Sequence, residues 1–154
     1  MNSPISTRSR TAMLPLVLRT CAIALITEIA LRTMRLDRAA KLLRVPLDTA
    51  PASPRPNPPN LITQFISDRI RATQIVFTRL SFENTCLRRA LVLGRLLRRF
   101  DPNLKIGVGH GDSQEPDRVI AHAWIETTCG TFGFDSDSGP QLAVLKRPGP
   151  PRQP

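Results

Sequence analysis

The spacing of the apolar residues changes once along this chain, at the turn Asp101-Pro102-Asn103. Before the turn, apolar residues recur at the spacing of a helix; after it, they alternate as they do in strands. Helices first and strands afterwards predict an α+β domain, with the helices packed on one face of a small antiparallel sheet. Four segments are strand candidates: Leu104 to Val108, Val119 to Thr127, Thr131 to Phe134 and Leu142 to Leu145.

Proline-rich stretches divide the rest of the chain. Residues 46–60 hold six prolines, and the last residues are again rich in proline. Such segments lack backbone donors and have little to bury, so they read as extended linkers. At 154 residues the chain is long enough for one domain with appendages. We therefore predict a basic helical region at 1–45, a linker at 46–60, the main folded domain at 60–145 and a tail at 146–154.

The N-terminal region predicts two helices. Thr11 to Leu31 is mostly apolar, but Arg19 splits the run, so we expect neither a cleaved signal nor a membrane-spanning helix. The next segment is amphipathic, with Leu36, Ala39, Ala40 and Leu43 on one face and Arg35, Arg38, Lys41 and Arg44 elsewhere. Those cations form either a solvated face or a docking surface for an acidic peptide, a partner protein or anionic lipid headgroups.

Charge and cysteine content restrict the partners and the compartment. The formal net charge of +10 and the pI near 11.3 favour an acidic partner. Aromatic residues make up only 5%, tyrosine is absent and no nucleic-acid-binding signature occurs, so we expect no nucleic-acid partner. The chain has three cysteines, an odd number, and no CxxC motif. This argues against a disulfide framework and favours a reducing, cytoplasmic location.

A lone cysteine is expected to begin the central helix. Asn84 and Thr85 are good N-caps for a helix that continues to Arg99. On this helix Cys86, Ala90, Leu93 and Leu97 form one line, and Arg88, Arg95 and Arg99 lie opposite. The unpaired N–H groups of the first turn favour a thiolate at Cys86, although a small buried apolar residue is the alternative. Gly94 would let a neighbouring element approach closely.

The second chemical motif is His122-Ala123-Trp124-Ile125-Glu126 on a predicted strand. Alternation puts His122, Trp124 and Glu126 on one face, so the tryptophan can shield a thiolate–imidazolium pair from water. A hairpin after this strand would bring Asp135 beside His122 to orient the imidazole, with Asp137 as the competitor of equal strand parity. Both aspartates are alternatively polar turn residues. Glu126 is a contact for a substrate cation or a structural carboxylate.

Metal and nucleotide sites are not predicted. Cys86, Cys129, His110 and His122 show no spacing that zinc ligands use. Gly107, Gly109 and Gly111 imitate a nucleotide-binding loop, but Asp112 stands where its third glycine would fall and no helix follows. His110 lies in this loop as a surface residue or a substrate contact. Thiol chemistry also requires no cofactor.

Cys86-Leu87-Arg88-Arg89-Ala90-Leu91, the arginines at 98 and 99, Ile106-Gly107-Val108 and the His-Ala-Trp-Ile-Glu segment resemble the lasso-peptide biosynthesis B proteins. These are leader peptidases of the transglutaminase-like, papain-related superfamily. The similarity covers roughly residues 14–145. It implies a transglutaminase-like, papain-like cysteine-protease fold, with Cys86 as nucleophile, His122 as base and Asp135 as orienter.

The resemblance also implies a function and partners. Such proteins cut the leader from a ribosomally made precursor peptide, and a macrolactam synthetase then cyclises the core. No leader-binding domain fits before the proline-rich linker, which resembles the split form and implies a separate leader-recognition protein. We expect no membrane contact. The alternatives are a transglutaminase-like acyltransferase and a non-catalytic leader-docking module.

Overall fold

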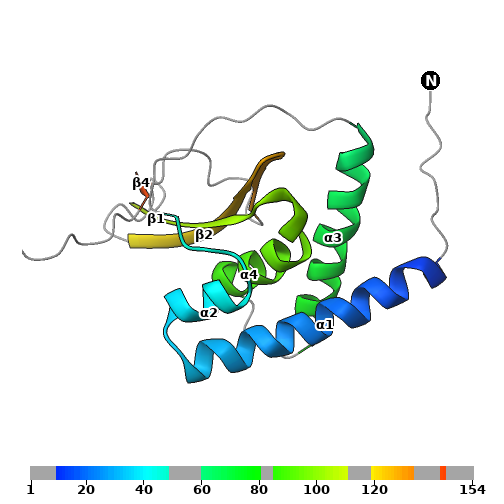
Figure 1. Cartoon of the computed structure of the whole chain (residues 1–154), viewed down its shortest axis with the longest axis horizontal. Helices are drawn as coiled ribbons and strands as arrows, with labels where there is room; N and C mark the ends of the chain where they lie inside the picture. Colours follow the sequence, from blue (N-terminus) through cyan, green and yellow to red (C-terminus); the bar gives the residue numbers. More distant parts are fainter. Residues whose placement is uncertain (1–9, 49–59, 81–84, 111–118, 134–142, 145–154) are drawn as a thin grey trace, which may run out of the picture.

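The computed structural model describes residues 10–48, 60–80, 85–110, 119–133 and 143–144. Within them, four α-helices precede a four-stranded antiparallel sheet (Figure 1). The α+β class predicted from the change in periodicity is therefore confirmed.

The helices form two layers beside the sheet. They are α1 (Arg10–Thr33), α2 (Leu36–Leu42), α3 (Asn60–Arg79) and α4 (Cys86–Leu96). Helix α1 packs across α3 and α4, and α4 in turn packs on the sheet, so α4 lies in the middle of the molecule (Figure 1).

The N-terminal helices share their core with the rest of the fold. One cluster joins α1, α3 and α4 through Ile23, Ala24, Val76, Phe77, Val92 and Leu96. On α2 the predicted apolar face is confirmed, because Ala39, Ala40 and Leu43 are buried while Arg35, Arg38 and Lys41 are exposed. The domain boundaries stay a prediction, but the helices on both sides of the proline-rich segment pack together.

Helix α4 is buried on almost every side, as its sequence predicts. Ala90, Leu91, Val92, Leu93, Gly94 and Leu96 are all buried. Full burial of a leucine contributes about 1.5–3 kcal/mol, so this helix contributes a large part of the core. The helix ends at Leu96 and not at Arg99, because a short 3-10 turn, Arg98–Phe100, follows it. Asp101 then adopts a left-handed conformation (φ 45°) and reverses the chain before Pro102.

The sheet has the order β3-β2-β1-β4. Its strands are β1 (Asn103–His110), β2 (Val119–Thr127), β3 (Gly130–Phe132) and β4 (Ala143–Val144). The register pairs Gly107 with His122 and Ile125 with Phe132. All four predicted strands are present, although β3 starts one residue earlier and ends two residues earlier than expected, and β4 has two residues.

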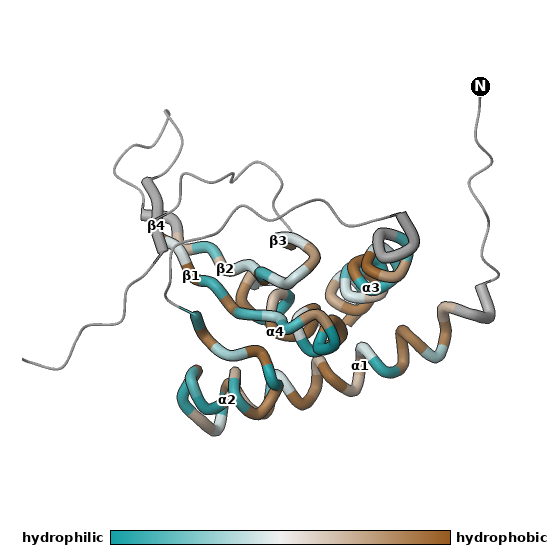
Figure 2. Tube along the Cα trace, turned by 45° about the horizontal axis from the view of Figure 1, so that its top comes forward, coloured by the Kyte–Doolittle hydropathy of each residue, from teal (hydrophilic) through white to brown (hydrophobic). Residues whose placement is uncertain are grey.

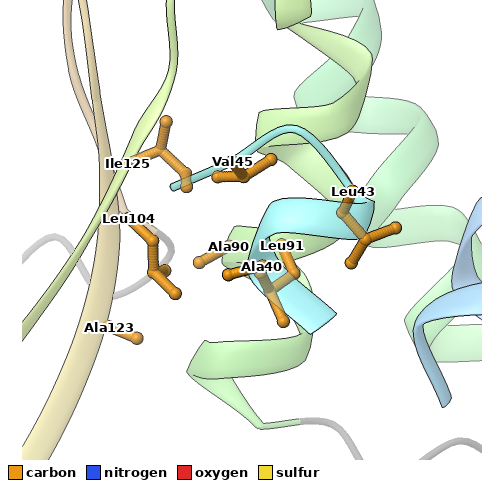
Figure 3. Packing of buried hydrophobic residues seen from close by; sticks show 8 residues of the cluster. All are labelled: Ala40, Leu43, Val45, Ala90, Leu91, Leu104, Ala123 and Ile125. Carbon is orange, nitrogen blue, oxygen red and sulfur yellow. The ribbon is translucent and has the colours of Figure 1, made fainter. Parts of the chain in front are cut away.

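The main core lies between α2, α4 and the sheet (Figure 3). Its buried members are Ala40, Leu43, Val45, Ala90, Leu91, Leu104, Ala123 and Ile125. Gly94 permits this packing: a Cβ at that position would lie 2.7 Å from Val45 Cγ1 and 3.0 Å from Ile125 Cδ1. The predicted close approach at Gly94 is confirmed. Leu80, which follows the last residue of α3, is 39% exposed.

Candidate active site

Cys86 is the first residue of α4, as the sequence predicts. Thr85 is the N-cap, and its hydroxyl oxygen accepts a hydrogen bond from the Arg88 backbone N–H at 3.4 Å. The Arg88 guanidinium donates a second bond to the same oxygen at 3.3 Å. The thiol thus lies at the N-terminal end of a buried helix, where the backbone N–H groups of the first turn have no partner within the helix.

An ion pair from α1 holds the start of this helix. Arg88 Nε donates to Glu28 Oε2 at 2.7 Å, and Glu28 also pairs with Arg32 at 2.7 Å. The side chain of Glu28 is only 10% exposed. The hydrogen bond from Arg88 is the main cause that keeps the pKa of Glu28 below its ordinary value, against the opposing effect of burial. A chain of contacts therefore leads from Glu28 through Arg88 to Thr85, the residue directly before Cys86.

Sequence reasoning missed this chain of contacts. It placed Arg88 on the side of α4 away from Cys86 but could not name a partner 60 residues away. One signal was present: Glu28 is the only acidic residue of α1. An isolated carboxylate among apolar residues is seldom buried without a cation beside it.

The sulfur of Cys86 contacts the strand that carries His122. Cys86 Sγ lies 3.9 Å from the carbonyl oxygen of Ala121, the residue directly before His122. The rest of the Cys86 side chain packs against the core cluster between α4 and the sheet. The structure thus brings Cys86, at the start of α4, against a residue of β2 that is 35 positions away in the chain.

The imidazole of His122 is buried next to Trp124. The two rings are nearly parallel, 15° apart, with their centres separated by 6.2 Å. His122 is 6% exposed and Trp124 9%. The predicted sharing of one face is confirmed, and Ala123 and Ile125 on the other face pack towards α4 (Figure 3). The direct pairing of the thiol with the imidazole belongs to the proposal below.

Gly133 borders the imidazole. A Cβ on this residue would lie 3.5 Å from His122 Nε2 and 3.7 Å from Trp124 Cβ. A larger side chain would therefore occupy the space beside the ring nitrogen. The sequence did not single out Gly133, because only the strand pairing shows that it lies across from Trp124.

The remaining predicted site residues are less defined. Asp135 and Asp137 lie outside the described residues, so the choice between them stays a prediction. His110 is the last residue of β1 and pairs with Val119, but its side chain is not among those described. Its role as a substrate contact also stays a prediction.

Glu126 lies in a buried polar cluster beneath the sheet surface. It is 3% exposed, and its Oε2 lies 3.7 Å from Lys105 Nζ. Lys105 is itself 1% exposed and pairs with Asp48 at 2.9 Å. Within the described part of the chain, Glu126 Oε1 has no hydrogen-bond partner. This burial favours the structural alternative for Glu126; contact with a substrate cation stays a prediction.

The other two cysteines lie in separate clusters. Cys21 packs beside Ile23 and Ala24 in the cluster of α1, whereas Cys129 packs beside Leu93 and Leu97 at the far end of α4. Among the residues that the structure describes, no three His, Cys, Asp or Glu side chains gather into a group that could hold a metal ion.

A cysteine that begins a buried helix, against an antiparallel strand carrying a shielded histidine, is the architecture of papain-related thiol enzymes. The chain belongs to the transglutaminase-like superfamily, because the model of that family matches residues 21–145. Members of this superfamily are generally cysteine peptidases or acyltransferases. Neither curated proteins nor solved structures gave a match.

Proposed function

We propose that this protein is a cysteine peptidase that removes the leader from a ribosomally made lasso-peptide precursor, before macrolactam cyclisation. The observation that carries the proposal is the contact of Cys86 Sγ with the backbone of the histidine-bearing strand. Membership of the transglutaminase-like superfamily supports thiol acyl chemistry in general. The lasso-peptide role is supported by the Cys-Leu-x-Arg-Ala-Leu and His-Ala-Trp-x-Glu motifs at Cys86 and His122.

In the proposed reaction, the Cys86 thiolate attacks the carbonyl carbon at the leader–core junction. His122 donates a proton to the departing amine of the core, which leaves the leader as a thioester on Cys86. His122 then takes a proton from water as the water attacks the thioester, which releases the leader acid and restores the thiolate. The backbone N–H of Cys86 at the helix start is the proposed donor to the oxyanion.

Asp135 is the proposed acceptor on the far nitrogen of His122. Strand β3 pairs with β2 so that Ile125 is opposite Phe132. Extended past Phe132, the same register would put residue 135 opposite His122 and residue 137 opposite residue 120. This count is part of the proposal, because both aspartates lie outside the described residues.

The proposed partners are the precursor peptide as substrate, a separate leader-recognition protein and a macrolactam synthetase acting on the product. The proposed location is the cytoplasm, in keeping with the cysteine usage. The superfamily match supports an acyltransferase equally well, in which an amine replaces water as the acceptor. A non-catalytic docking module would use the same fold without its thiol.

One assay separates the three functions. The protein is incubated with its precursor peptide and the leader-recognition protein, and products are followed by mass spectrometry. Free leader and free core are expected, and Cys86→Ala or His122→Ala should lower the rate by at least about 10³-fold. An amine adduct would instead identify an acyltransferase, and binding without product would identify a docking module.

Matched variants test the third residue. Asp135→Asn should lower the cleavage rate on the order of 10²–10⁴-fold, because the imidazole would lose its orienting acceptor. Asp137→Asn removes the same charge two residues later and should leave the rate near that of the wild type. The reverse order would assign the role to Asp137.

A further inference from the structure

The exposed apolar side chains are concentrated on α1, α2 and the residues next to them. Nine large apolar side chains are exposed among the described residues, and eight of them fall between Leu14 and Leu47. They are Leu14, Leu18, Leu25, Ile26, Ile29, Met34, Leu42 and Leu47; the ninth is Leu80. Single exposed apolar residues are common, but eight of them in one region of the fold indicate an interaction surface.

On α1 these side chains form one stripe along the outer side of the helix. At 100° per residue, Leu14, Leu18, Leu25 and Ile29 fall within about 60° of one another over about 22 Å of helix. Their exposed fractions lie between 53% and 61%. The opposite side of α1 packs on α3 and α4, so the stripe faces away from the core (Figure 1). Figure 2 shows the apolar character of α1 along most of its length.

The exposed charges around the stripe have one sign. Between Met13 and Asp48 the exposed charged residues are Arg19, Arg32, Arg35, Arg38, Lys41 and Arg44. The acidic residues of this region do not offset them at the surface. Glu28 is buried in its ion pairs, Asp48 pairs with Lys105, and Asp37 is half-buried.

We propose that this α1–α2 face, made of the eight exposed apolar residues and the exposed cations Arg32, Arg35, Arg38 and Lys41, binds the surface of an anionic phospholipid bilayer. An apolar helix face flanked by Lys and Arg is the signature of a helix that lies in the membrane interface. Anionic headgroups complement the cations, and the acyl boundary takes the apolar stripe. A protein interface would instead have a rim of mixed polar residues, whereas all the exposed charges here are positive. The inference does not depend on the peptidase function.

The helix lies on the bilayer rather than crossing it. Met13–Thr33 is long and apolar enough to span a membrane, and 33% of its most apolar stretch is buried inside the fold. A spanning α1 would have to leave the core it shares with α3 and α4 and break the Glu28–Arg88 pair. If α1 binds the bilayer through its outer side, it keeps these contacts. The sheet then lies on the side of α4 that faces away from the bilayer. The expectation of no membrane contact, drawn from sequence alone, is replaced by this proposal.

The test is sedimentation of the full chain with vesicles. Phosphatidylcholine vesicles that contain about one third phosphatidylglycerol should pellet the protein at low salt. Pure phosphatidylcholine vesicles should pellet it more weakly, and 0.5 M NaCl should release it, because salt screens the cations. Each cation near an anionic surface raises binding roughly fivefold. Arg35→Ala with Arg38→Ala should therefore lower the partition coefficient on the order of tenfold or more.

Matched controls exist elsewhere on the molecule. Leu18→Gln with Leu25→Gln should abolish binding, whereas Leu80→Gln should not change it. The control for the charge pair is Arg71→Ala with Arg79→Ala, two exposed arginines on α3. Circular dichroism confirms that each variant is folded. The proposal is wrong if the controls weaken binding as much as the test variants, or if no vesicle pellets the protein. In that case the face could still bind a protein. A dimer that dissociates in the Leu18→Gln, Leu25→Gln variant would assign the face to a second copy of the chain. Binding only to an acidic soluble protein would assign the face to that protein.

Discussion

At the scale of single residues, the space around His122 is what the structure adds to the sequence motif. Alternation along the strand is enough to place His122 beside Trp124, because side chains of a strand point to alternate faces. It cannot show that a Cβ at position 133 would lie within van der Waals distance of the ring nitrogen, because that proximity comes from the pairing of β3 with β2.

This arrangement predicts the reactivity of the three thiols. With iodoacetamide at pH 6–7, Cys86 should alkylate faster than Cys21 and Cys129, because it lies at a helix N-terminus and is proposed to pair with an imidazole. His122→Ala should slow the reaction on the order of tenfold or more. Gly133→Leu should also slow it by crowding the ring nitrogen, whereas Gly133→Ala makes an ordinary contact and should react like the wild type. Peptide mapping by mass spectrometry gives the three rates; equal rates for all three thiols would contradict the proposed pair.

At the scale of elements, the position of α4 depends on one close approach. The sequence predicted a neighbour at Gly94 from the missing side chain alone. Only the structure identifies that neighbour as Val45, which follows α2 and packs between α4 and Ile125 (Figure 3).

Gly94→Ala should destabilise the protein by about 1–2 kcal/mol. Alanine gains about 0.5–1 kcal/mol of helix propensity, but overpacking against a branched, fully buried valine costs about 1–3 kcal/mol. Urea unfolding measures the change. The double variant Val45→Ala with Gly94→Ala should be more stable than the sum of the two single effects, by about 1 kcal/mol. Additive effects would show that the two side chains do not compete for space.

Element ends were predicted less well than element types. The periodicity of Cys86 to Leu97 identifies a helix, but the apolar pattern does not show where α-helical hydrogen bonds change to a 3-10 turn. The strand ends also differ, because β3 is set by how far it pairs with β2 and not by its own alternation.

At the scale of the whole molecule, the Glu28–Arg88 pair joins the first helix to the helix that carries the thiol. The pKa of Glu28 is lowered in the folded protein, mainly by the hydrogen bond from Arg88. A lowered pKa means that the folded state binds this proton less readily than the unfolded state does. The pair therefore stabilises the fold above the ordinary pKa of 4.5, and this contribution is lost as the pH falls from there through the folded value.

Glu28→Gln should accordingly lower the free energy of unfolding by about 1–3 kcal/mol at pH 7, because Arg88 is left without its carboxylate. The difference from the wild type should shrink as the pH falls below 4.5. Urea unfolding at pH 7 and at acidic pH measures both effects. Asp37→Asn is the control, because it also removes one negative charge, here from a half-buried side chain on α2. A difference that does not depend on pH would mean that the pair does not act through its charge.

The sequence by itself determined the class of fold, the identity of the central helix, its start at Cys86 and the face shared by His122 and Trp124. These follow from local periodicity and capping, which depend on residues close together in the chain. Tertiary structure alone decided the pairing of Glu28 with Arg88, the approach of Val45 to Gly94 and the contact of the Cys86 sulfur with the strand of His122. It also decided which side of α1 is buried, because that helix is apolar nearly all round and its own pattern gives no direction.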